Sequence, residues 1–109
     1  MSSRRHSVVW TEVAVRDVER LAARLYEDAP GRAERILDRI ISRGESLTSM
    51  SSRGRTPPEL RPIADRTWLE VLESPWRILF RVVGRVEIHA VLDGRRDLRD
   101  ILLERILDA

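Results

Sequence analysis

The chain has 109 residues, of which 42% are hydrophobic and 35% charged; this excludes a largely disordered protein and predicts one domain over residues 1–109, with a modest core and a disordered start at 1–6. It has no cysteine and no apolar run near the ~20 residues of a membrane span, which excludes disulfides, thiolate chemistry and membrane insertion and favours the cytoplasm. The net charge is only +2, yet all 20 basic residues are arginine, whose planar guanidinium suits phosphate and carboxylate.

The first half of the chain predicts a short strand followed by a helical hairpin. Residues 7–11 are typical of a strand, and Thr11 is a suitable N-cap for a helix over 12–28. The pattern breaks at Pro30, and apolar residues at helical spacing then predict a second helix over 31–48. Because the connection is short, the two helices are expected to pack antiparallel.

The second half predicts three consecutive strands and a last helix. An irregular segment over 48–66, with three prolines and a glycine, comes first. The strands are expected at Thr67–Glu73, Trp76–Val83 and Val86–Leu92. The last helix carries its apolar residues at Leu98, Ile101, Leu102 and Ile106. The order β-α-α-β-β-β-α predicts an α+β domain whose helical hairpin packs on an antiparallel-rich sheet.

Catalytic and metal chemistry has little support in the sequence. The only histidines are His6 and His89, which lack the spacing of metal ligands, so we expect neither a metal nor another cofactor. Strand alternation places His89 on the face opposite Ile88 and Ala90. A lone histidine on a strand more often packs than catalyses.

Arginines around the predicted strands are the strongest functional signal. Arg77 and Arg81 share one face of the strand at 76–83. The candidates for binding a target or a partner are Arg53, Arg55, Arg77, Arg81, Arg95 and Arg96. Converging guanidinium groups can bind phosphate or an acidic partner. An interpretation of nearly equal weight is that carboxylates on neighbouring strands neutralise them, namely Glu70, Glu73, Glu87 and Asp97.

Five ordered features over residues 7–103 distinguish the chain. They are the Val8-Val9-Trp10-Thr11 strand, the break at Pro30, the Gly54-Arg55-Thr56-Pro57-Pro58-Glu59-Leu60 loop, the Trp76-Arg77-Ile78-Leu79-Phe80-Arg81-Val82 strand and the Asp93-Gly94-Arg95-Arg96-Asp97-Leu98 ending. In this order they resemble the RelE/ParE superfamily, the toxins of bacterial type II toxin–antitoxin pairs. The resemblance implies a toxin that inhibits growth, is linked to plasmid stabilization and is neutralised by a cognate antitoxin. The antitoxin would dock in an apolar groove between the helical hairpin and the sheet, giving a hetero-oligomer, with a homodimer as another possible state.

The superfamily contains two activities. RelE-like members are metal-independent endoribonucleases that cut messenger RNA on the ribosome. By position, Arg77 and Arg96 match arginines of that site and His89 is the next candidate, but the lysines and the C-terminal tyrosine or histidine are missing. ParE-like members inhibit DNA gyrase, and the proline-rich loop and the Gly-Arg-Arg-Asp-Leu ending look more like ParE. The resemblance therefore favours a gyrase inhibitor over an enzyme, with the ribosome and its messenger RNA as the alternative target.

Overall fold

The computed structural model describes residues 5–63 and 66–109. Its elements are β1 (Val8–Trp10), α1 (Glu12–Asp28), α2 (Ala33–Glu45), α3 (Leu47–Met50), the 3₁₀ turns η1 (Ser51–Arg53) and η2 (Pro58–Ile63), β2 (Trp68–Glu73), β3 (Trp76–Val82), β4 (Val86–Asp93) and α4 (Arg99–Leu107). The predicted order is confirmed, with α2 and α3 sharing the second predicted helix. Residues 1–4 of the predicted disordered start lie outside the described residues, and the backbone N–H of His6 donates to the Thr48 carbonyl at 2.8 Å.

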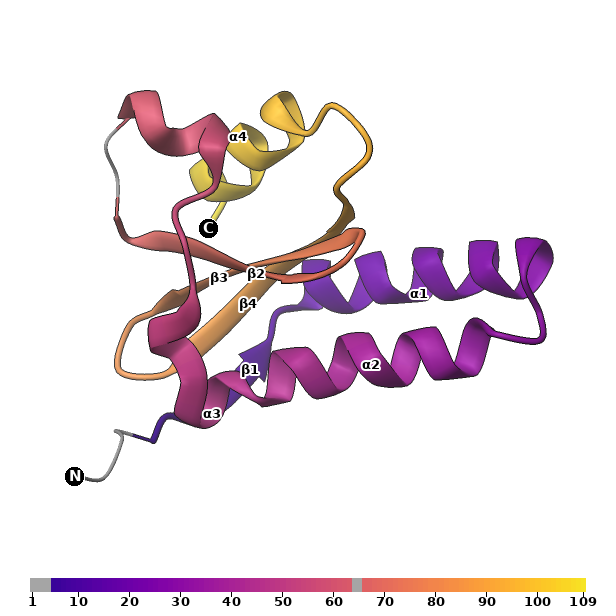
Figure 1. Cartoon of the computed structure of the whole chain (residues 1–109). Coiled ribbons are helices and arrows are strands. Elements are labelled where there is room, and N and C mark those ends of the chain that lie inside the picture. The colour runs from indigo at the N-terminus through magenta and orange to yellow at the C-terminus, as the bar shows by residue number, and fades with distance from the viewer. Residues whose placement is uncertain (1–4, 64–65) are drawn as a thin grey trace.

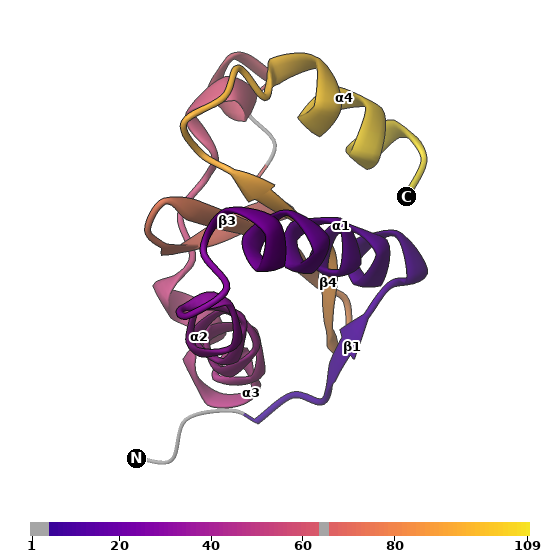
Figure 2. The same cartoon turned by 90° about the vertical axis from the view of Figure 1, so that its right-hand side faces the viewer.

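The four strands form one sheet in the order β1-β4-β3-β2. β1 runs parallel to β4, and the other two pairs are antiparallel. The hairpin of α1 and α2 covers one face of this sheet, whereas α4 and η2 lie on the other side (Figures 1 and 2). The predicted α+β architecture is therefore confirmed, and the molecule has a helical layer on each side of the sheet.

Each face of the sheet has its own core. On the hairpin side the core contains Ile40, Leu47, Ile78, Phe80 and Ile88, none more than 1% exposed. On the α4 side it contains Leu60, Trp68, Leu79, Ala90, Leu98 and Leu102, none more than 4% exposed. Apolar residues of β3 thus alternate between two buried surfaces, since a strand sends successive side chains to opposite faces. Burial on both faces fixes the register of β3, because a slip of one residue would exchange the two cores.

A β-bulge in β4 corrects one prediction. Leu79 of β3 pairs with Ala90, but the next residue, Phe80, pairs with Ile88, so His89 is left without a partner across the strand. The inserted residue reverses the alternation of β4. Ile88 therefore faces the hairpin core while Ala90 faces the α4 core, and the predicted common face for these two residues is wrong.

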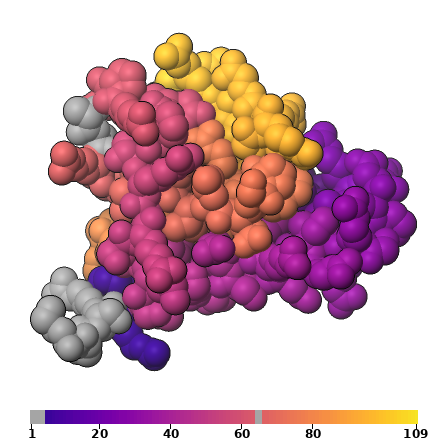
Figure 3. Space-filling view, in the orientation of Figure 1, coloured from indigo at the N-terminus to yellow at the C-terminus, as the bar shows by residue number. Residues whose placement is uncertain are grey.

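The hairpin is anchored to the sheet at its base and projects from it at its tip. Thr11 caps α1 as predicted, accepting from the Ala14 N–H at 3.3 Å, and its hydroxyl also donates to the Ile88 carbonyl at 2.9 Å. At Gly44 of α2, a Cβ atom would lie 2.4 Å from the Trp10 ring, so only glycine allows this close approach of helix and strand. The turn between α1 and α2 extends beyond the sheet, and the space-filling view shows it as a protrusion (Figure 3).

Candidate functional site

A cleft of about 1160 Å³ is walled by α1, by the ends of β3 and β4, and by α4. Ten of its twenty lining residues are charged, and six of these are arginines: Arg20, Arg24, Arg32, Arg95, Arg96 and Arg105. Four carboxylates oppose them, so the cleft carries a surplus of positive charge. Apolar side chains line the same cleft, among them Leu21, Leu25, Trp76, Val91 and Ile101.

The position of this cleft differs from the groove expected between hairpin and sheet. That interface is filled by the hairpin-side core, where Ile40 and Ile78 are fully buried. The opening lies beside it instead, where the hairpin continues past the strands and α4 forms the opposite wall. A cleft that combines apolar residues with excess arginine can accept an amphipathic segment with acidic residues.

A buried ion pair connects the two walls of the cleft. Asp17 of α1 is 6% exposed, and its carboxylate accepts from both Nη atoms of Arg105 on α4, at 2.6 and 2.7 Å. The same carboxylate accepts from the Val91 N–H at 2.9 Å, and Arg105 also donates to the His89 carbonyl at 2.7 Å. These bonds hold α4 against α1 and β4. Neither residue is among the predicted site residues, although an acid within the apolar stripe of α1 was a usable signal.

Arg77 is held by hydrogen bonds to two carboxylates. Its Nη atoms each donate to one oxygen of Glu59 in η2 at 2.6 Å, and its Nε donates to Glu70 at 2.7 Å. Glu70 is 1% exposed and also accepts from Arg55 Nε at 3.0 Å. The hydrogen bond from Arg77 holds the pKa of Glu59 below its usual range, and Glu59 in turn raises the pKa of Arg77. Gly94 packs against the Arg77 side chain, where an added Cβ would lie 2.9 Å from Cδ.

Arg81 belongs to a second cluster, built around the bulge. It donates to Glu87 at 2.8 Å and lies over the Trp68 ring at 5.0 Å from the centroid. His89 packs edge-on against Trp68, with 4.9 Å between centroids, and lies 3.2 Å from Glu87. The hydrogen bond from Arg81 is the main reason that the pKa of Glu87 falls to about 2, and burial lowers the pKa of His89. Burial against Trp68 thus disfavours the charged form of His89.

The remaining predicted arginines lie at the surface. Arg95 pairs with Asp93 at 2.9 Å and lies 5.7 Å from the Trp76 centroid, and it holds the pKa of Asp93 below its usual range. Arg96 lines the cleft and Arg53 lines a separate shallow depression; neither has an ion pair among the described residues. Of the six predicted binding arginines, the structure places two in the cleft and pairs Arg55, Arg77 and Arg81 with carboxylates elsewhere.

The three residues of the alternative catalytic site are not joined. Arg77 contacts Glu59 and Glu70, His89 packs against Trp68, and Arg96 lines the cleft. Among the described residues, no hydrogen bond or ion pair links any two of the three. Across residues 5–63 and 66–109, no group of His, Asp or Glu has the arrangement of a metal site, and no helix there is long and apolar enough to cross a membrane.

Fold and site together define a small α+β domain with a charged cleft that suits a protein partner. Comparison with known proteins identifies the family. The model of the ParE toxin of the type II toxin–antitoxin system parDE matches residues 8–98, and the chain belongs to this family of toxins. No curated protein sequence matches the chain significantly.

Solved structures share the fold. A structure of the chromosomal ParDE toxin–antitoxin system from P. aeruginosa superposes with a TM-score of 0.67 at 20% identity, over 84% of this chain and 98% of that one. The toxin–antitoxin complex RelBE2 from Mycobacterium tuberculosis gives a TM-score of 0.59 at 22% identity, over 82% of this chain and 91% of that one. The predicted membership of the RelE/ParE superfamily, closer to ParE, is thereby confirmed.

Proposed function

We propose that this toxin inhibits DNA gyrase and does not cleave RNA. The observation that carries the proposal is the engagement of Arg77. A nuclease that used this arginine would need its guanidinium free to meet a phosphate, yet Nε, Nη1 and Nη2 each donate to a carboxylate. The match to a ParE family model supports the same choice. Gyrase as the target would place the protein in the cytoplasm.

We also propose that a cognate antitoxin neutralises the toxin by binding in the cleft. The excess arginines would meet acidic side chains, and Leu21, Trp76 and Ile101 would contact an apolar face of the antitoxin. Arg96 is a suitable residue for testing this contact, because it lines the cleft without an ion pair among the described residues, as Arg20, Arg24 and Arg32 do. Both solved neighbours are toxin–antitoxin complexes, which supports a partner of this kind.

The test of the target uses two reactions in parallel. Purified toxin should inhibit supercoiling by gyrase without ribosomes and should leave messenger RNA intact on programmed ribosomes. The His89→Gln variant should inhibit as well as the natural chain, because His89 contacts Trp68 and Glu87 rather than the cleft. Codon-positioned cleavage on ribosomes with unchanged supercoiling would contradict gyrase inhibition and support the ribosomal alternative.

The test of the cleft measures binding of the antitoxin. The product of the small gene adjacent to this one is the probe, titrated against purified toxin by calorimetry. Arg96→Gln should weaken binding about 10-fold to 100-fold through loss of a charge-assisted hydrogen bond. Arg99→Gln is the matched control, since Arg99 is exposed on α4 and does not line the cleft. Equal affinities for both variants would contradict binding in the cleft.

A further inference from the structure

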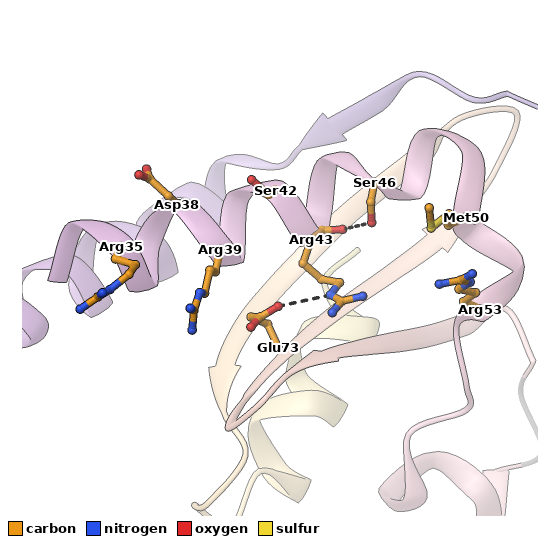
Figure 4. Close-up of a pocket in the computed structure, with 9 residues that line it drawn as sticks. All are labelled: Arg35, Asp38, Arg39, Ser42, Arg43, Ser46, Met50, Arg53 and Glu73. Atoms are coloured by element: carbon orange, nitrogen blue, oxygen red, sulfur yellow. Dashed lines mark hydrogen bonds and ion pairs between the residues drawn. The ribbon is translucent and has the colours of Figure 1, made fainter. Parts of the chain in front are cut away.

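A row of arginines on α2 is unexplained by the cleft or by the ion-pair networks. Arg35, Arg39 and Arg43 are four residues apart along this helix, and Arg53 of η1 lies at the same surface. All four are exposed and line a shallow depression with Asp38, Ser42, Ser46, Met50 and Glu73. We call these four arginines the α2 arginine row. Figure 4 shows Arg35, Arg39 and Arg43 extending from one side of α2, with Asp38 pointing away.

The α2 arginine row is only weakly neutralised. Arg43 donates to Glu73 at 3.4 Å, a long contact for an ion pair. Arg35, Arg39 and Arg53 have no ion pair among the described residues. This contrasts with Arg77, which is bound by two carboxylates. Since like charges at this spacing on a helix repel one another, the row lowers the stability of α2 unless an anion offsets it.

We infer that the α2 arginine row binds the phosphate backbone of duplex DNA. Residues four apart advance about 6 Å along a helix. Phosphates of one DNA strand are about 3.4 Å apart along the duplex axis, so successive arginines of a helix lying along the backbone can each contact a different phosphate. The hydroxyl groups of Ser42 and Ser46 lie at the same surface and belong to the side-chain types that contact phosphate.

The lining of the depression favours DNA over an acidic protein segment. Met50 is its one apolar residue, and the other eight are polar or charged. Protein partners bury an apolar centre within their interface, whereas DNA interfaces are polar and strongly positive. The cleft between α1 and α4, with its many apolar residues, has the composition expected for a protein partner. The two surfaces thus differ in the residue types that line them, and the apolar part of the depression is supplied by Met50 and by the aliphatic stems of its arginines.

DNA binding by the α2 arginine row does not depend on gyrase inhibition, and the binding assay contains no gyrase. Anisotropy of a labelled random-sequence duplex of about 20 base pairs, titrated with the full chain, measures the affinity at several salt concentrations. Four phosphate contacts predict a slope of about −3.6 in log affinity against log salt, equivalent to a loss of roughly 100-fold between 50 and 200 mM. The triple variant Arg35→Gln, Arg39→Gln, Arg53→Gln should reduce the magnitude of this slope by about 3.

A matched triple variant distinguishes an effect of the α2 arginine row from an effect of the net charge of the protein. Arg16→Gln, Arg61→Gln and Arg99→Gln remove the same three charges from exposed positions outside the depression, and should leave the slope nearly unchanged. Circular dichroism confirms that both triple variants remain folded. Equal losses in both variants would overturn the inference, as would tighter binding of single-stranded RNA or of a poly-glutamate peptide of equal charge. If the toxin binds DNA but does not inhibit supercoiling by gyrase, this result contradicts gyrase inhibition and still supports DNA binding by the α2 arginine row.

Discussion

The arginines of the sheet and those of α2 have opposite electrostatic surroundings. Arg77 on β3 is 12% exposed and bound to Glu59 and Glu70, whereas Arg39 on α2 is exposed with no ion pair among the described residues. Both side chains are arginine, but only the second has donors available for a ligand. The density of arginines along a sequence therefore does not locate a binding surface, because the strands that concentrate arginine also carry the acids that pair with it.

Burial explains why the sheet network is structural. Glu70 is 1% exposed, and a carboxylate at that depth persists only when donors surround it. Arg55 and Arg77 supply those donors from the loop and from β3. The network therefore connects η2 and the preceding loop to the sheet, and it uses guanidinium groups that sequence analysis assigned to a ligand.

The largest expected effect comes from breaking this network. Arg77→Met keeps most of the side-chain volume but leaves Glu59 without its partner and Glu70 with Arg55 alone. Removing one member of a buried pair costs about 3–5 kcal/mol, so the free energy of unfolding should fall by about that amount in urea denaturation.

Arg95→Gln is the control for that measurement. Arg95 was predicted to have the same role as Arg77, but its side chain is 68% exposed and its pair with Asp93 is at the surface. Because water screens an exposed ion pair, the pair adds little to stability, and this variant should be almost as stable as the natural chain. Similar losses for the two variants would remove the distinction between structural and surface arginines.

A smaller effect should appear on acidification, through the cluster at the bulge. The hydrogen bond from Arg81 lowers the pKa of Glu87 from 4.5 to about 2. A carboxyl whose pKa is lower in the folded state adds stability above the unfolded value and loses it as pH falls. The free energy of unfolding should therefore decrease by about 1–2 kcal/mol between pH 5 and pH 2 through this group, after allowance for solvent screening.

His89 should also lower the free energy of unfolding on acidification, but at a higher pH than Glu87. Burial lowers its pKa in the folded chain, so the unfolded chain binds the proton first as pH falls below 6.5 and stability decreases there. Denaturation midpoints between pH 7 and pH 2 measure both groups. Glu87→Gln should flatten the lower part of this profile and His89→Gln the upper part, whereas unchanged profiles would contradict the role of the cluster.

The sequence predicted the elements well because their signals are local. Helical and alternating periodicity, the Thr11 cap and the turns around Pro75 and Gly84 depend on residues close in the chain. The bulge at His89 has no such signal, since no glycine or proline marks it, and it was missed. One inserted residue was enough to reverse the faces predicted for the end of β4.

The site was predicted only in part because its partners are distant in sequence. Arg105 and Asp17 are 88 residues apart, and Glu59, the main partner of Arg77, is 18 residues from it in the irregular segment. The packing of η2 and α4 on the sheet brings these charges together. The spacing of residues along the sequence does not predict this packing. The sequence therefore points to arginine as the candidate residue type but does not distinguish paired from unpaired arginines.

Proton exchange at the arginine side chains of the unmodified protein tests most directly the distinction between paired and unpaired arginines. Nitrogen-15 NMR resolves the Nε–H of individual arginines and the rate at which each exchanges with water. We predict that the Arg77 Nε–H, which donates to Glu70 at 2.7 Å, exchanges about 10-fold to 100-fold more slowly than those of Arg35, Arg39 and Arg53. Equal exchange rates at Arg77 and Arg39 would contradict the claim that carboxylates hold Arg77 and leave Arg39 available for a ligand.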